Sequence, residues 1–223
     1  VKGKFDNNKY NNNIIKNLDD EITFLPLVNG KGVLKELLIL DEDKKDINIL
    51  LLAGGFGKRL GKITKNLPKP LVKIANKPII EYVLKKLEEI NNTNITYISL
   101  HYHADQIINY IDNRKCNLNI EYVIEKKPMG TIGSASLLKK SNNDLLVINS
   151  DIYSKLKLSN LISFHRNNKF DATIAIANYE VNIPFGIINY DNNNNFLGIN
   201  EKPNFNYYIS AGMYVLSSKV VSL

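Results

Sequence analysis

Residues 49–80 read ILLLAGGFGKRLGKITKNLPKPLVKIANKPII, and this stretch decides how the whole chain is interpreted. The apolar run INILLLA at 47–53 predicts a short buried strand of a parallel sheet, because it is continuous and ends at a glycine turn. The glycines that follow permit positive φ values and let a ligand approach the backbone without meeting a Cβ atom. Backbone N–H groups in such a turn form a concave anion site. A phosphate-binding loop after the strand is therefore predicted, with a plain strand-to-helix turn as the alternative.

Two common glycine motifs do not fit the spacing of this loop. The dinucleotide motif G-x-G-x-x-G would need a third glycine where Leu60 stands. The P-loop ends in G-K-[ST], whereas Gly57-Lys58 is followed here by Arg59. The loop is therefore neither of these.

Two cations close to the glycines strengthen the phosphate interpretation. Arg59 carries a planar, permanently charged guanidinium that matches phosphate oxygens. Lys69 lies between Pro68 and Pro70, and both prolines restrict the conformations of its loop. Most lysines in a lysine-rich chain are solvated surface charges, but a lysine held this way is a candidate ligand for a phosphate.

Together these residues resemble a known family. LAGGFGKRL at 52–60 and PKPL at 68–71 resemble the signature of the sugar-nucleotide pyrophosphorylases, or nucleotidylyltransferases, which reads L-A-G-G-x-G-x-R-L followed by P-K-P-L. The resemblance extends over residues 47–223 and implies transfer of a nucleotidyl group from an NTP to a sugar 1-phosphate, with release of pyrophosphate. It implies that Arg59 steadies the departing pyrophosphate and that Lys69 binds the α-phosphate. It further implies that the nucleotide contacts Leu52, Ala53, Gly54, Gly55 and Gly57.

A third charged candidate follows another apolar strand. Asn149-Ser150-Asp151 comes directly after DLLVI, and α/β sheets bind ligands at the carboxyl ends of their strands. A carboxylate there can hold Mg²⁺ against phosphate oxygens. The family resemblance makes Asp151 the metal ligand, whereas a helix-capping or turn aspartate is the alternative.

The segment EKKPMGTIGSA at 125–135 resembles the loop with which the family reads the base. The resemblance implies nucleotide contacts from Pro128, Gly130 and Thr131. Glu125 favours guanine, because a carboxylate only accepts hydrogen bonds and the guanine edge donates two, whereas uracil and thymine suit an amide. The alternative is that Glu125 faces solvent beside two lysines.

Three later segments match sugar-binding parts of the family. Gly186 lies in FGII at 185–188, and Glu201 and Lys202 lie in EKP at 201–203. The resemblance implies that Glu201 accepts hydrogen bonds from sugar hydroxyls and that Lys202 is a catalytic residue holding the sugar phosphate. SAGMY at 210–214 matches N-A-G-x-Y, except that Ser210 replaces the asparagine of the family. Without the resemblance, E-K-P is only a turn at the end of a strand.

Strands alternate with helices along most of the chain. An apolar stripe with helical spacing covers 77–91, and later segments read as strands at 96–102, 120–124, 145–148 and 171–179, and as helices at 104–114, 133–140 and 158–167. This order predicts an α/β fold with a doubly wound, mostly parallel sheet, which the resemblance makes a Rossmann-like nucleotidyltransferase fold. Segments 186–190 and 196–200 flank DNNNN and predict a small β-hairpin sugar-binding part, and 209–216 is a late strand.

The first 44 residues have a different pattern. Apolar strands are predicted at 22–28 and 33–40 around a glycine turn, and FLPLVNGKGVLKELLIL resembles the end of a cystathionine-β-synthase-type (CBS) module. An additional hairpin of the main domain is the alternative. DEDKKD at 41–46 is a charged linker, so the domains are predicted to be 1–44, a CBS remnant with its linker, and 45–223, the nucleotidyltransferase domain.

A CBS module ahead of such a domain is similar to glucosamine-1-phosphate guanylyltransferases of bacterial legionaminic acid biosynthesis. GTP and glucosamine 1-phosphate are therefore the expected substrates, and mannose 1-phosphate or a uridylyl, thymidylyl or cytidylyl transfer are the alternatives. The family takes a second metal carboxylate from a later segment, expected beyond Leu223, so the domain is expected to be truncated at its C-terminal end. A non-catalytic nucleotide sensor is the alternative of a different class.

The amino-acid composition limits which binding partners and which cellular compartment are expected for the protein. The net charge is +7, and residues 1–44 balance at −1 from seven lysines and eight acidic residues, so the remainder carries +8, which suits a polyanionic substrate. Lys and Arg do not cluster with aromatic residues, which argues against nucleic acid. No apolar run approaches the roughly 18 residues of a membrane span, and the single Cys116 fits the reducing cytoplasm. A homo-oligomer is left open, and the three histidines are expected to be structural.

Overall fold

A computed structural model of the protein describes residues 24–28, 31, 33–39 and 46–222. The chain divides into two compact units, Val1–Lys44 and Lys45–Leu223, within the charged segment that the sequence marks as a linker. In the first unit, β1 (Phe24–Val28) pairs antiparallel with β2 (Leu34–Ile39), and the register shifts between Leu27 and Val28. Its kinship to a CBS module stays a prediction, and residues 1–23 and the linker lie outside the described residues.

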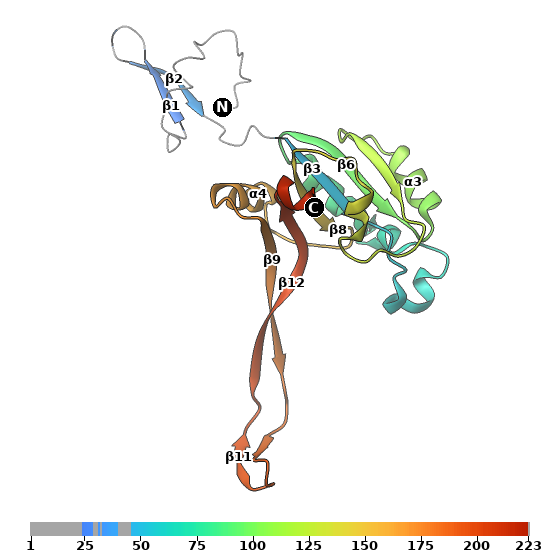
Figure 1. The fold of residues 1–223 in the computed structure, drawn as a ribbon, viewed down its shortest axis with the longest axis vertical. Coiled ribbons are helices and arrows are strands. Elements are labelled where there is room, and N and C mark those ends of the chain that lie inside the picture. The colour runs from blue at the N-terminus through green and yellow to red at the C-terminus, as the bar shows by residue number, and fades with distance from the viewer. Residues whose placement is uncertain (1–23, 29–30, 32, 40–45, 223) are drawn as a thin grey trace. The chain divides into compact units, whose positions relative to one another are not determined.

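The second unit is built on a six-stranded sheet with the order β7-β6-β3-β8-β12-β9 (Figure 1). Its strands are β3 (Ile47–Leu52), β6 (Thr93–Leu100), β7 (Ile120–Ile124), β8 (Asp144–Asn149), β9 (Ala172–Asn182) and β12 (Asn204–Leu216). The first four are parallel to one another, whereas β12 runs antiparallel to both β8 and β9. The predicted α/β fold with a mostly parallel sheet is confirmed.

Short elements and helices connect these strands. They are η1 (Lys58–Thr64), η2 (Lys69–Leu71), β4 (Lys73–Ile74), β5 (Lys77–Pro78), α2 (Ile79–Glu88), α3 (Ala104–Asp112), η3 (Gly133–Leu137), α4 (Leu158–Asn167), β10 (Ile187–Tyr190), β11 (Phe196–Asn200) and α5 (Ser218–Val221). The helix predicted at 133–140 is wrong in type, because the chain makes only a short 3₁₀ turn there. None of the helices in the described part of the chain combines the length and the apolar character needed to cross a bilayer.

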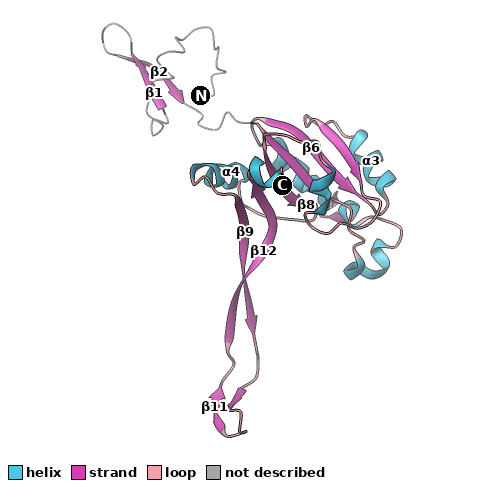
Figure 2. Ribbon diagram, in the orientation of Figure 1, coloured by secondary structure: helices cyan, strands magenta, loops and turns pink. Residues whose placement is uncertain are grey.

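The three longer helices all pack on one face of the sheet (Figure 2). Ile80 of α2, Ile107 of α3 and Leu161 of α4 belong to the same buried cluster as Ile49 and Leu51 of β3. The alternate residues of the strands form a second cluster on the other face, where Ala135 of η3 and Val221 of α5 partly cover it. Burial on both faces explains why β3 is a continuous apolar run instead of an alternating one.

Two long strands, β9 and β12, leave the sheet as a two-stranded arm with the hairpin β10–β11 at its far end (Figure 1). Antiparallel pairing extends β9 to Asn182 and starts β12 at Asn204, so both strands are longer than the sequence pattern predicts. The pairing register shifts between Ser210 and Tyr214, which marks the place where the arm joins the sheet.

Candidate active site

The carboxyl ends of three neighbouring strands meet at one edge of the sheet. The Ala53 N–H donates to the Ser99 carbonyl at 2.9 Å, and the Ser150 N–H donates to the Leu52 carbonyl at 3.0 Å. These contacts place the glycine loop after β3, the end of β6 and Asp151 after β8 at the same edge, which is where open α/β sheets bind ligands. From the sequence, the glycine loop and Asp151 are expected directly after two apolar strands, and the structure places both at this edge.

Each glycine of the loop has a different role in the structure. Only Gly57 has a positive φ, +63°, and a Cβ there would lie 2.9 Å from Thr64 Cγ2 and 3.0 Å from Lys69 Cβ. Gly54 packs against the backbone, since its Cβ would lie 3.1 Å from the His101 nitrogen. A Cβ at Gly55 would meet no described atom within 4 Å, so the space beside it is open. Of these three glycines, Gly57 alone uses the positive φ that the residue permits.

Lys69 and Asp151 form an ion pair across 82 residues of sequence. Pro68 and Pro70 are both buried and flank the start of η2, so the backbone of Lys69 is held from both sides. The Nζ atom of Lys69 donates to Asp151 Oδ2, while the two side chains keep 34% and 28% of their surface exposed. The structure thus brings together the predicted phosphate-binding cation and the predicted metal ligand, and both remain accessible to a substrate.

The backbone of Arg59 continues the glycine loop that follows β3. It lies in η1, which Gly61 interrupts with φ +55° and ψ −121°. Thr64 donates from Oγ1 to the Gly57 carbonyl at 3.0 Å and so closes the loop onto the glycines. The side chain of Arg59 lies outside the described part of the structure, and its contact with pyrophosphate stays a prediction.

The base-reading segment is organised around the buried side chain of Glu125. Its Oε1 accepts a hydrogen bond from Ser99 Oγ, and its Oε2 accepts from the Met129 N–H at 3.0 Å. Only 7% of Glu125 is exposed, so it neither faces solvent nor presents an open carboxylate edge. The hydroxyl of Ser99 comes from β6, 26 residues earlier, and no local pattern in the sequence predicts that contact.

The exposed part of this segment lies beyond Glu125. Pro128, Gly130 and Thr131, the other predicted nucleotide contacts, are exposed. Gly130 has a φ of +75°, which explains the glycine at that position. Gly133 is needed for space, because a Cβ there would lie 2.8 Å from Met129 Cβ. The loop is thus tethered at Glu125 and open at its tip.

His101 connects the glycine loop to the base-reading segment. Its Nδ1 lies 2.8 Å from the Glu125 carbonyl, and since a carbonyl can only accept, Nδ1 carries the proton. The His101 ring also makes an edge contact with Phe56, with ring centroids 5.4 Å apart. Next to it, the Tyr102 hydroxyl donates to the Lys65 carbonyl at 2.8 Å. These contacts are structural, and they join the two loops that the sequence assigns to the nucleotide.

The predicted sugar-binding residues fall into two places. Ser210 accepts from the Gly212 N–H at 3.2 Å, and a Cβ at Gly212 would lie 2.6 Å from Asn149 Nδ2, so this segment packs beside the strand that leads to Asp151. Gly186 and Glu201 instead lie next to each other on the arm, since a Cβ at Gly186 would lie 2.9 Å from Glu201 Oε2. Lys202 follows there with a φ of +43°. These residues adjoin the hairpin β10–β11, which lies at the end of the arm away from the sheet (Figure 1), and their contacts with a sugar stay predictions.

The side chains at the strand edge can be compared with what Mg²⁺ requires. Within the described part of the chain, no group of three or more His, Cys, Asp and Glu side chains is gathered to hold a metal ion. Mg²⁺ does not need such a cage, because it keeps several waters and is commonly bound by one or two carboxylates together with substrate phosphates. Asp151, a partly exposed hard oxygen donor beside the open glycine loop, fits that kind of site.

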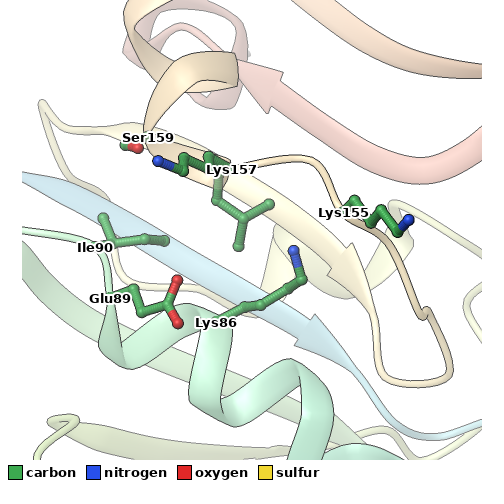
Figure 3. Close-up of a pocket in the computed structure, with 7 residues that line it drawn as sticks. Lys86, Glu89, Ile90, Lys155, Lys157 and Ser159 are labelled. Atoms are coloured by element: carbon green, nitrogen blue, oxygen red, sulfur yellow. The ribbon is translucent and has the colours of Figure 1, made fainter.

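A separate cavity of about 430 Å³ lies between the end of α2 and the start of α4 (Figure 3). It is lined by Lys86, Glu89, Ile90, Lys155, Lys157, Leu158 and Ser159, and it contains none of the predicted site residues. Its lysines do not converge: Figure 3 shows the ammonium groups of Lys155 and Lys157 pointing to opposite sides. Lys86 donates to the Leu156 carbonyl at 2.7 Å. The cavity is therefore not assigned to the substrate.

Known proteins are similar to this chain over most of its length. The profile of the nucleotidyl transferase family matches residues 48–223. The catalytic subunit beta of a mannose-1-phosphate guanylyltransferase from Drosophila pseudoobscura pseudoobscura is 31% identical over 180 residues, which cover 77% of this chain and 48% of that protein. The bifunctional protein GlmU of Methanococcus maripaludis is 31% identical over 183 residues, 79% of this chain and 42% of that protein. The chain thus spans about half the length of the curated relatives it matches.

Solved structures show the same fold. The crystal structure of HddC from Yersinia pseudotuberculosis superposes with a TM-score of 0.57 at 29% identity, covering 78% of each chain. A second structure of that protein, complexed with GMP-PN, gives a TM-score of 0.55 at 28% identity over the same 78% of each chain.

Proposed function

Because the chain belongs to the nucleotidyl transferase family, we propose that the protein transfers a nucleotidyl group from a nucleoside triphosphate to a sugar 1-phosphate and releases pyrophosphate. The observation that carries the proposal is the Lys69–Asp151 ion pair beside an open glycine loop at the carboxyl edge of the sheet. An oxygen of the sugar phosphate attacks the α-phosphorus in line, and the bond from that phosphorus to the bridging oxygen of pyrophosphate breaks. The attacking phosphate is already ionised, so the reaction needs no histidine as a base.

Catalysis then consists of positioning and charge neutralisation. Lys69 binds the α-phosphate, Arg59 steadies the pyrophosphate, and the backbone of the glycine loop contacts the phosphates. Lys202 holds the sugar phosphate, which requires the arm to bend toward the sheet when substrate binds. Asp151 would hold Mg²⁺ together with the phosphates of the substrate, and the bound ion would supply further neutralisation of negative charge. The enzyme works in the cytoplasm, in keeping with its single cysteine.

GTP and glucosamine 1-phosphate are the proposed substrates. Guanine is supported by the relatives, since several are guanylyltransferases and the HddC structure was solved with a guanine nucleotide analogue. Glucosamine 1-phosphate rests on the resemblance of the first unit to a CBS module, which points to legionaminic acid biosynthesis. Mannose 1-phosphate is the competing acceptor, because several of the similar proteins are mannose-1-phosphate guanylyltransferases.

The test is pyrophosphate release by the protein with Mg²⁺, GTP and glucosamine 1-phosphate, run beside UTP, CTP and dTTP and beside mannose 1-phosphate. Release with GTP and glucosamine 1-phosphate is expected. Release of pyrophosphate only with another NTP or another sugar 1-phosphate would support nucleotidyl transfer but contradict the proposed substrates. If the full-length protein releases no pyrophosphate with any of these combinations while nucleotides still bind, the catalytic proposal is refuted in favour of a nucleotide sensor.

A further inference from the structure

The side chain of Glu125 is committed to contacts within the protein. One carboxylate oxygen accepts from the Ser99 hydroxyl and the other from the Met129 N–H, at a site where only 7% of the glutamate is exposed. A buried carboxylate is costly unless hydrogen bonds satisfy it, so these two donors are what permit a charge at this position. Glu125 is thus held as a junction between the sheet and the loop.

Ser99 provides the rigid side of this junction. It lies in β6 with no exposed surface, and β6 pairs with β3 on one side and with β7 on the other. A hydroxyl on an interior strand has little freedom, so it fixes one oxygen of the carboxylate in space. Glu125 begins the segment that continues through Met129 to the exposed tip at Gly130, where φ is +75°. Holding the Met129 N–H therefore holds the base of that tip.

We propose that Ser99, acting through Glu125, is a positioning residue that sets the loop at residues 126–131 for the nucleotide base. Ser99 has no exposed surface, so it cannot touch the substrate itself. In this arrangement the base contacts the backbone of the loop tip, and the carboxylate of Glu125 serves the loop instead of reading the guanine edge. The proposal rests on the proposed function, because it assigns the loop to the nucleotide that the reaction consumes.

The test compares Ser99→Ala with a matched control on the same strand. Thr96 is also fully buried in β6, and its hydroxyl has no hydrogen-bond partner among the described residues, so Thr96→Val removes a buried hydroxyl without breaking a bond. Ser99→Ala should raise KM for GTP about tenfold, the effect of losing a hydrogen bond to a charged group, with a smaller change in kcat. Thr96→Val should leave both constants close to those of the wild type.

A second nucleotide separates positioning from base reading. Inosine triphosphate lacks the 2-amino group of guanine, so a carboxylate that reads that group makes the protein prefer GTP. If Glu125 only positions the loop, Ser99→Ala and Glu125→Gln change the kinetic constants for GTP and inosine triphosphate by the same factor. A drop in the preference for GTP in either variant would show that Glu125 contacts the base, and it would overturn the proposal.

Hydrogen exchange gives a readout that does not require turnover. The Met129 amide should exchange faster in Ser99→Ala than in the wild type, and at the wild-type rate in Thr96→Val, while circular dichroism confirms that all three proteins are folded. Unchanged Met129 exchange in Ser99→Ala would refute the junction. If the wild-type protein released no pyrophosphate with any NTP, the proposed function would fail, and the exchange experiment would still decide whether Ser99 and Glu125 hold the loop.

Discussion

Lys69 shows how single residues organise the site. A Cβ at Gly57 would lie only 3.0 Å from the Cβ of Lys69, so a larger residue at position 57 would crowd the lysine. Its ammonium group reaches Asp151, which joins the loop after β3 to the end of β8. Because both side chains are about one-third exposed, the pair is accessible to phosphate oxygens.

Replacing Lys69 with Gln should therefore lower kcat by about two orders of magnitude or more, since a preorganised charge at the reacting phosphate is lost. The fold should remain intact, because a partly exposed ion pair contributes little to stability. Lys73→Gln is the matched control, as Lys73 is an exposed lysine in the adjacent β4. Pyrophosphate release measures both variants, and a rate close to the wild type in Lys69→Gln would contradict the assignment.

At the scale of elements, an arginine clamp joins α2 to the chain after α3. Arg114 donates to Glu81 at 2.9 and 3.1 Å and to Glu88 at 2.6 and 3.1 Å. The hydrogen bond that Arg114 donates to Glu88 is the main reason that the pKa of Glu88 is lowered, and the same interaction raises the pKa of Arg114. The clamp ties together two helices that cover the same face of the sheet.

Arg114→Met should lower the free energy of unfolding by about 2 kcal/mol, less than for a fully buried pair because the partners keep some exposure. Lys115→Met is the control, since Lys115 is the exposed neighbour. Because the folded pKa of Glu88 is lowered, its contribution is present above the unfolded value of 4.5 and is lost as the pH falls through the folded value. Urea unfolding at neutral and acidic pH measures the free energy of unfolding of both variants. Equal free energies for the two variants at neutral pH would show that the contacts of Arg114 do not stabilise the fold.

The limits of a helix or strand could be predicted from the sequence where residues within that segment determine its structure. The apolar stripe at 77–91 forms α2, which begins at Ile79 directly after Pro78. The segment at 133–140 forms only the 3₁₀ turn η3, because the backbone becomes extended at Leu138, a change of conformation that the helical spacing does not reveal.

For the whole second unit, a buried histidine links stability to pH. His165 of α4 is 2% exposed, and its Nδ1 lies 2.9 Å from Thr173 Oγ1 of β9. Burial lowers the pKa of His165 below its ordinary 6.5. The imidazole of His165 therefore binds a proton more readily in the unfolded chain than in the folded one. Its contribution to the free energy of unfolding is present above pH 6.5 and is lost as the pH falls below that value.

His165→Gln should flatten the decline in unfolding free energy between about pH 7.5 and pH 5.5, by at most about 1.4 kcal/mol per pH unit, the limit for one proton. Chemical unfolding at several pH values in that range measures the slope. A slope identical to the wild type would show that His165 does not titrate on unfolding.

In the molecule as a whole, the sequence alone determined the features that depend only on residues close together in the chain. The apolar run of β3, the glycine loop and the proline-flanked Lys69 are local, since burial pattern, φ preference and backbone restriction act within a few residues. The alternation of strands and helices was likewise enough to predict the mostly parallel sheet.

Only the tertiary structure decided which distant residues meet. Lys69 contacts Asp151 because β3 and β8 are neighbours in the sheet, and Glu125 is buried because Ser99 stands opposite it on β6. Gly186 and Glu201 lie out on the arm because β9 and β12 pair far beyond the sheet. Such contacts follow from the order and length of paired strands, which depend on packing between segments far apart in sequence, and local preferences do not encode that packing.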